Sequence, residues 1–101
     1  VSLLAVGRDP EAGARVVALA VERGARSARF VAADMLDPAA PAYILAAAET
    51  FGPPTILVNA VGGNVAQGVF AESDPAQWMG DIDLNFGTVL RMTRAVLPGM
   101  I

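Results

Sequence analysis

The sequence of 101 residues contains no histidine, no cysteine and no lysine, and its seven basic residues are all arginines. Without these side chains the chain cannot supply a serine–histidine pair, a thiol nucleophile, a Schiff-base lysine or the lysine of a phosphate-binding loop. It also cannot form a disulfide or a metal site built from histidine and cysteine, so we expect no metal. The lack of cysteine is compatible with a reducing compartment, and we expect a cytoplasmic location.

Excess positive charge and long apolar runs are also absent. The formal net charge is -3, which gives no support for a nucleic-acid partner. No apolar run approaches the roughly 18 residues that span a bilayer, so we expect no membrane partner. A composition of 54% hydrophobic and 17% charged residues is typical of a folded domain and not of a disordered chain.

Both ends of the sequence resemble cut ends. The chain opens inside an apolar run, Val1–Val6, with no lead-in, and it closes at 98–101, where a predicted helix has just ended before Pro98. We therefore expect a piece of a longer protein. The alternative is a domain whose termini have been trimmed.

Apolar runs of strand length alternate with segments of helical spacing along the chain. The predicted strands are 1–7, 29–33 and 55–59, and the predicted helices are 11–23, 38–51 and 75–97. Asp37 and Pro38 are expected as the N-cap and first residue of the second helix. This alternation predicts an α/β fold with an open parallel sheet. Ligands of such sheets bind at the carboxyl ends of the strands.

Four segments that follow the predicted strands and form the last helix resemble the short-chain dehydrogenase/reductase family, in the family's order. They are Gly7-Arg8, Asp34-Met35, Ile56-Leu57-Val58-Asn59-Ala60-Val61-Gly62, and Asp83-Leu84-Asn85-Phe86-Gly87-Thr88 running on to Ala95-Val96-Leu97-Pro98-Gly99-Met100. The resemblance implies that residues 1–101 form part of an NAD(P)-binding Rossmann domain. This part is a doubly wound parallel sheet with three strands alternating with helices, and the first strand and the C-terminal part lie outside the sequence.

Arg8 directly follows the first predicted strand, where the resemblance places the adenosine ribose of a dinucleotide. A guanidinium there can hold a 2′-phosphate in its fork. Relatives that prefer NAD usually carry an acidic residue at the strand end, where this chain has Gly7. The resemblance therefore implies NADP as cofactor, with NAD possible. The alternative is a solvated arginine beside Asp9.

Asp34 and Met35 end the second predicted strand. The resemblance implies that the Asp34 carboxylate accepts a hydrogen bond from the adenine amino group and that Met35 supplies backbone contacts. The alternative for Asp34 is a turn or helix-capping aspartate, a role that Asp37 can also fill.

Asn59, Ala60, Val61 and Gly62 form the turn after the third predicted strand. Glycine lets the backbone approach a ligand closely, and the resemblance implies that these four residues bind the cofactor ribose. The chain departs from the family pattern, because Ala60 replaces a second asparagine and Val61 replaces alanine. The alternative is an ordinary glycine turn.

Asn85 lies beside an apolar stripe of the last predicted helix, where its amide must find partners or cost about 1–3 kcal/mol. The resemblance implies a catalytic role: the matching asparagine lies where its helix bends, and its backbone holds a water of the proton relay. Gly87 suits such a kink. The family's glycine three residues after this asparagine is Thr88 here. The alternative is a locally bonded or exposed asparagine.

The chain lacks the rest of the family's machinery. The glycine-rich TGxxxGxG loop belongs before Val1, and the catalytic serine, tyrosine and lysine belong after Ile101; Tyr43 has no lysine four residues on. The resemblance implies a parent enzyme that transfers hydride between a nicotinamide and a carbonyl/alcohol substrate, commonly as a homo-oligomer, with this chain inactive by itself. The alternatives are a non-catalytic dinucleotide-binding or interaction module of the same fold, and an unrelated doubly wound domain.

Strand order supplies one further expectation. In the 3-2-1-4 order of a doubly wound sheet, the strand before residue 1 lies between 1–7 and 55–59. Without that strand, both segments present unpaired backbone groups inside the core region. We expect the isolated chain to be poorly stable, to aggregate or to pair in a non-native way.

Overall fold

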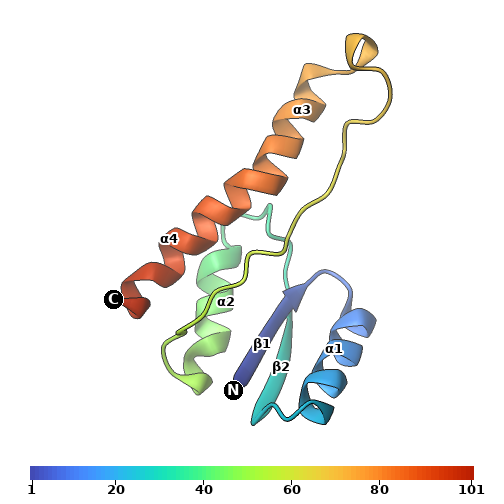
Figure 1. Cartoon of the computed structure of the whole chain (residues 1–101). Coiled ribbons are helices and arrows are strands. Elements are labelled where there is room, and N and C mark those ends of the chain that lie inside the picture. The colour runs from blue at the N-terminus through green and yellow to red at the C-terminus, as the bar shows by residue number, and fades with distance from the viewer.

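The computed structural model describes all residues, 1–101, and shows a layered α/β unit followed by one long helix (Figure 1). Its elements are β1 (Ser2–Gly7), α1 (Pro10–Glu22), β2 (Ser27–Ala32), α2 (Ala40–Ala48), the short 3-10 turns η1 (Glu49–Phe51) and η2 (Phe70–Glu72), α3 (Pro75–Ile82), the π-helical turn η3 (Asp83–Gly87) and α4 (Thr88–Met100). The predicted alternating α/β fold is confirmed.

The two strands form a parallel sheet covered on both faces. β1 pairs with β2 in register from Ser2 opposite Ser27 to Gly7 opposite Ala32. α1 covers one face, and α2 with α4 covers the other (Figure 1). Parallel strands are connected through a covering helix, because the chain must return to the same end of the sheet. α1 makes this crossover, and it lies close because Gly13 of α1 leaves its Cβ position to the ring of Phe30.

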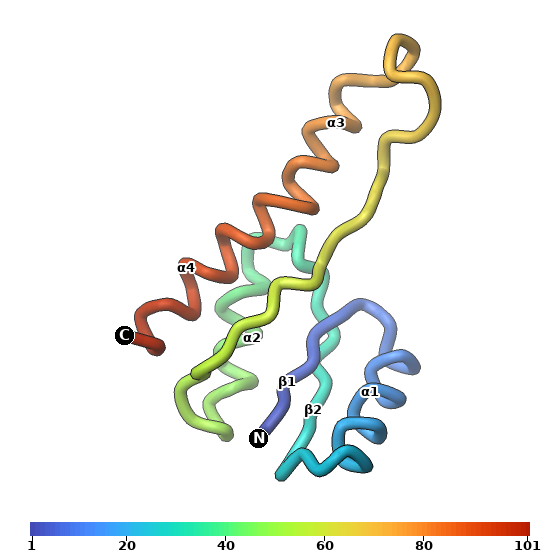
Figure 2. Tube along the Cα trace, viewed as in Figure 1, coloured from blue at the N-terminus to red at the C-terminus, as the bar shows by residue number.

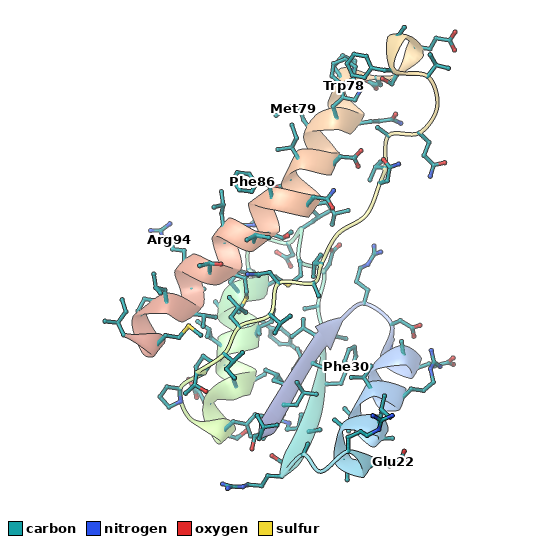
Figure 3. The ribbon with its side chains drawn as sticks, viewed as in Figure 1. Glu22, Phe30, Trp78, Met79, Phe86 and Arg94 are labelled. Atoms are coloured by element: carbon teal, nitrogen blue, oxygen red, sulfur yellow. The ribbon has the colours of Figure 1, made fainter.

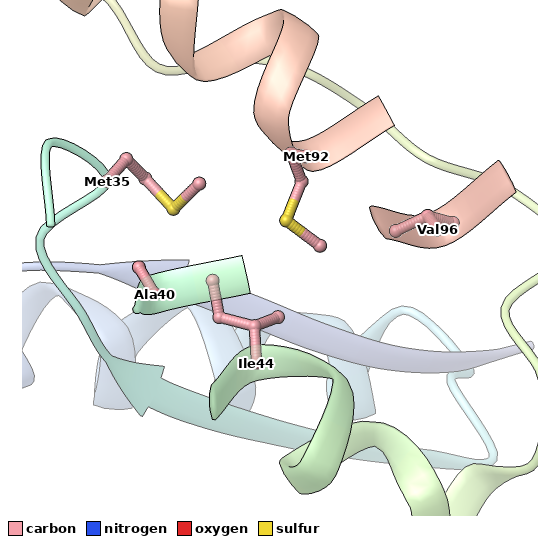
Figure 4. Close-up of a cluster of buried hydrophobic side chains, with 5 residues drawn as sticks. All are labelled: Met35, Ala40, Ile44, Met92 and Val96. Atoms are coloured by element: carbon pink, nitrogen blue, oxygen red, sulfur yellow. The ribbon is translucent and has the colours of Figure 1, made fainter. Parts of the chain in front are cut away.

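The core lies between α2, α4 and the β2–α2 loop. Met35, Ala40, Ile44, Met92 and Val96 are buried together there (Figure 4). Leu4 and Val6 of β1 and Leu57 pack against this cluster from the sheet side. Leu4 and Val6 share a face because alternate residues of a strand point the same way. The core thus joins the strands to the last helix.

The predicted third strand, 55–59, is absent as a strand. The sheet contains only β1 and β2, and residues 53–68 make no backbone–backbone hydrogen bond. The segment runs as an extended trace past β1 and along the long helix (Figure 2). A ladder needs a partner strand, and no strand lies against this segment, so its apolar sequence alone cannot make it a β-strand.

Two predicted helix boundaries are wrong. α2 begins at Ala40, not at Pro38, because the Asp37 carboxylate first closes a turn by accepting the Ala39 N–H at 2.9 Å. The last helix continues through Pro98 to Met100. Pro98 removes one donor near the helix end, while the Ile101 N–H still donates to the Leu97 carbonyl at 3.1 Å.

The chain is expanded for its size. Its accessible surface is 7041 Å², whereas a compact monomer of this mass exposes about 5400 Å². Its radius of gyration is 15.6 Å, against about 13 Å for a compact 100-residue domain. Only 9 of 101 residues are buried. None of the helices combines the length and the apolar character that crossing a membrane requires.

Candidate functional site

The predicted site residues fall into two groups: Arg8, Asp34 and Met35 follow the carboxyl ends of the two strands, and the others lie in the segment 59–62 or on the long helix. Arg8 follows β1 and Asp34 follows β2 at the same edge of the sheet, since the strands are parallel and in register. The segment 59–62 passes this edge on its way along the helix (Figure 2). η3, which contains Asn85, lies on the other side of that segment and holds it by hydrogen bonds.

Side chains of the long helix supply every hydrogen bond of residues 53–68. Asn59 Nδ2 donates to Thr93 Oγ1 at 3.3 Å. Asn85 bonds Gly63 twice, and Asp81 accepts two further backbone N–H groups of the segment. The three helical residues are separated by four and eight positions, which puts them on one face. Side chains on one face of the long helix therefore fix the path of residues 59–66.

The side chain of Asn85 is exposed and hydrogen-bonded through both amide atoms, which matches the alternative given for this residue. Its Oδ1 accepts the Gly63 N–H at 3.0 Å, and its Nδ2 donates to the Gly63 carbonyl at 2.7 Å and to the Asp81 carbonyl at 2.8 Å. The residue lies within the π-helical turn, and such turns occur frequently at functional sites. The π-helical turn thus interrupts the regular helix at the position where the resemblance places a bend.

The glycines of the turn make room for the helix. A Cβ atom at position 62 would lie 2.8 Å from Asn85 Oδ1, and one at position 63 would lie 3.1 Å from Leu84. At Gly62, where we expect close approach of a ligand, the structure shows close approach of the Asn85 side chain. The backbone N–H and C=O groups of residues 59–62 make no hydrogen bond within the chain, so they are available to a ligand.

Asp34 and Met35 each use some polar groups in contacts within the chain and leave another polar group without a partner. One carboxylate oxygen of Asp34 accepts the Leu36 N–H at 3.0 Å, which is the turn-forming role considered as the alternative. The second oxygen accepts no hydrogen bond. Met35 buries its side chain in the core, and its carbonyl accepts from Arg91 Nη2 at 3.4 Å. Its N–H makes no hydrogen bond within the chain.

Arg8 has no partner within the protein. It is exposed and makes neither an ion pair nor a hydrogen bond. Its neighbour Asp9 is engaged elsewhere, because its carboxylate caps α1 by accepting the N–H groups of Glu11 at 2.9 Å and Ala12 at 3.3 Å. An unpaired guanidinium thus stands at the carboxyl end of β1.

In this chain a glycine, Gly87, lies two residues after Asn85, whereas the family pattern has it three residues after. The structure explains this difference. Arg91 Nη1 and Asp83 Oδ1 form an ion pair at 2.6 Å, and this pair crosses the helix over Gly87. A Cβ atom at position 87 would collide with Asp83 Oδ1 and come within 3.0 Å of Arg91 Nη1. The neighbouring Thr88 is buried, with Oγ1 donating to the Leu84 carbonyl at 2.7 Å. Glycine is therefore needed one position earlier than in the family pattern.

Two glycine-to-alanine substitutions in this helix test that explanation. Gly80 has open space around its Cβ position, so Gly80→Ala should raise the free energy of unfolding of the complete protein by about 0.5–1 kcal/mol through helix propensity. Gly87→Ala should give little or none of that gain, because it displaces a partly exposed ion pair worth about 0.2–1 kcal/mol. Urea denaturation measures both, and equal gains would contradict the explanation.

Sequence reasoning singled out neither Asp81, Thr93 nor Arg91, although all three fix the site. The sequence does contain a signal. Asp81, Asn85 and Thr93 share one face of the predicted helix, and Asp81 and Asn85 are polar residues separated by four positions. Their partners lie at least fifteen residues away in the sequence, so the pairing itself is not visible in a local pattern.

A parallel α/β unit with free polar groups at the carboxyl edge of its strands is typical of a dinucleotide-binding domain. The family model for short chain dehydrogenases matches residues 1–101. The chain belongs to the short-chain dehydrogenase family.

Several solved structures have a similar fold. A 3-oxoacyl (acyl-carrier-protein) reductase from Agrobacterium tumefaciens C58 with NADP bound is 22% identical, covers 99% of this chain and has a TM-score of 0.81. An L-sorbose reductase from Gluconobacter frateurii, complexed with NADPH and L-sorbose, is 22% identical over 98% of the chain, with a TM-score of 0.85. An NADH-dependent reductase A1-R' complexed with NAD is 26% identical over 98%, with a TM-score of 0.84.

The chain spans only 38–41% of the length of these three structures. No curated protein is significantly similar to it in sequence.

Proposed function

We propose that this chain forms the adenosine-binding part of an NADP-dependent oxidoreductase, which transfers hydride between the nicotinamide and a small carbonyl/alcohol substrate. The single observation that carries the proposal is the unpaired Arg8 at the carboxyl end of β1, on the same edge as Asp34 and the free backbone of 59–62. The structural neighbours that bind NADP, NADPH and NAD support the cofactor class.

The residues of the chain fit a dinucleotide in distinct roles. Arg8 would hold a ribose 2′-phosphate, because a guanidinium binds phosphate oxygens in a fork. The free carboxylate oxygen of Asp34 would accept from the adenine amino group, and the Met35 N–H would donate to the ring. Residues 59–62 would contact the ribose through their backbone. The cofactor supplies hydride chemistry, and the protein supplies binding and orientation.

We also propose that Asn85, besides holding Gly63, is the catalytic residue of this chain. Its side chain is engaged with Gly63 and the Asp81 carbonyl, and the π-helical turn interrupts the regular i to i−4 bonding of the helix. A backbone carbonyl released from that bonding can hold a water of a proton relay. The proposed location of the protein is the cytoplasm, which its cysteine-free sequence favours.

The test of the cofactor assignment is Arg8→Ala in the complete protein, measured by fluorescence titration with NADPH and with NADH. Loss of a charge-assisted fork to phosphate costs about 1.5–3 kcal/mol, so the Kd for NADPH should rise about 10- to 100-fold. The Kd for NADH, which has no 2′-phosphate, should change less than about 3-fold.

Arg23→Ala is the matched control, because Arg23 is an exposed arginine at the far end of α1 with no partner. It should leave both constants unchanged. Equal weakening of NADPH and NADH by Arg8→Ala, or no weakening at all, would reject the NADP role of Arg8.

We also propose that the complete protein is a homo-oligomer, supported by an apolar outer face of the long helix. Met79, Ile82, Phe86 and Leu90 are each more than half exposed, and Met79 and Phe86 point away from the sheet (Figure 3). Monomers rarely expose such continuous apolar stripes.

A further inference from the structure

The backbone of residues 62–66 makes no hydrogen bond to other backbone groups, so side chains must hold the shape of this loop. Gly63 is bound by Asn85, and Val65 and Ala66 are bound by Asp81: the Val65 N–H donates to Oδ1 at 2.5 Å and the Ala66 N–H donates to Oδ2 at 3.1 Å. The loop is thus held at two points by one helix, and Asp81 supplies the second point.

A carboxylate suits this position better than any other side chain. Two successive backbone N–H groups need two acceptor atoms side by side, and only aspartate or glutamate offers two equivalent oxygens. Hydrogen bonds from backbone N–H groups to an ionised carboxylate are stronger than those between neutral groups. An asparagine would keep one acceptor and turn an NH2 group toward the other N–H.

Asp81 and Asn85 act as one network. The Asp81 backbone carbonyl accepts from the same Asn85 Nδ2 that donates to the Gly63 carbonyl. The side chain of Asp81 is partly buried and makes no ion pair, so both oxygens remain with the loop. Any movement of 65–66 away from the helix therefore pulls on the Gly63 contacts of Asn85.

We infer that Asp81 is a positioning residue that fixes the loop 62–66, and through it the ribose-binding turn 59–62, for the dinucleotide. This inference rests on the proposed function, because the turn precedes the loop directly and has no backbone partner of its own. Preorganised binding groups cost less entropy on binding, so the held loop favours cofactor affinity.

The test uses the complete protein with Asp81→Asn, Asp81→Glu and the matched charge control Glu22→Gln; Glu22 is exposed at the end of α1 and has no hydrogen-bond partner. Backbone hydrogen exchange of the peptide covering 60–68 is measured, together with NADPH titration and thermal melting. Asp81→Asn should speed exchange in 60–68 about 10-fold and raise the Kd for NADPH about 5- to 10-fold. Exchange in β1 and β2 should stay unchanged, and Glu22→Gln should change neither quantity.

Asp81→Glu keeps both oxygens and should recover part of the exchange protection and of the NADPH affinity. Unchanged exchange in 60–68, faster exchange without a change in the Kd for NADPH, or faster exchange throughout the protein would each overturn the inference. A wild-type protein that binds no NADPH would overturn the proposed function instead, and the exchange of 60–68 in Asp81→Asn would still report whether Asp81 holds the loop.

Discussion

Replacing Asn85 with alanine in the complete protein should lower kcat about 100-fold. The side chain makes three hydrogen bonds, two to Gly63 and one to the Asp81 carbonyl. At about 1 kcal/mol each their loss costs about 3 kcal/mol, and each 1.36 kcal/mol corresponds to about a tenfold change in rate. The substitution releases the turn and lets the π-helical segment relax, which under the proposed role of Asn85 would misplace the groups that transfer the proton.

The measurement is steady-state reduction, followed as loss of NADPH absorbance, with the best substrate from a panel of small ketones. Gln77→Ala is the matched control, because it removes an exposed amide from the same helix that makes no hydrogen bond. It should leave kcat within about 2-fold of the wild-type value. An Asn85→Ala enzyme that also stays within that range would show that Asn85 has no part in turnover.

The isolated chain of residues 1–101 should not unfold as a single cooperative unit. Few side chains are buried, the accessible surface exceeds that of a compact monomer by about a third, and β1 pairs on one edge only. Ile56 and Val58 are 73% and 78% exposed. Unpaired strand edges and exposed apolar side chains favour association between chains.

Thermal melting followed by near- and far-ultraviolet circular dichroism, with light scattering, checks this expectation. We expect a broad far-ultraviolet transition, a weak near-ultraviolet signal from Trp78 and Tyr43, and scattering that grows with concentration. A sharp transition that coincides in both spectral regions would contradict it. The complete protein is the control and should show that coincidence.

Local sequence signals predicted the elements that depend on local physics. β1 and β2 were found within two residues from their apolar runs, and α1 within one residue from its spacing. The predicted start of the last helix at residue 75 is correct, and the Asp74 carboxylate caps it by accepting the Ala76 N–H at 2.9 Å. The segment 55–59 was predicted as a strand because it has the same apolar character as β1, and it failed because strand pairing requires a distant partner.

The site, too, contains some residues that could be predicted from the sequence and others that could not. Residues that follow strand ends, such as Arg8 and Asp34, could be selected from sequence because parallel strands deliver their carboxyl ends to one edge. The cofactor roles of these residues stay predictions that the NADPH titration addresses. The partners of the loop could not be selected, since Asp81 and the N–H groups of residues 65 and 66 that donate to it are fifteen or more positions apart in the sequence.

By itself the sequence determined the alternation of the first two strands with helices, the lack of histidine, cysteine and lysine chemistry, and which residues end those two strands. These properties follow from side-chain type and short-range spacing. Only the tertiary structure decided that Gly62 yields space to Asn85, that Gly87 lies beneath the Asp83–Arg91 pair, and that Asp81 holds the loop. Such contacts form when the long helix packs along residues 53–68, and no local pattern encodes which side chains then meet.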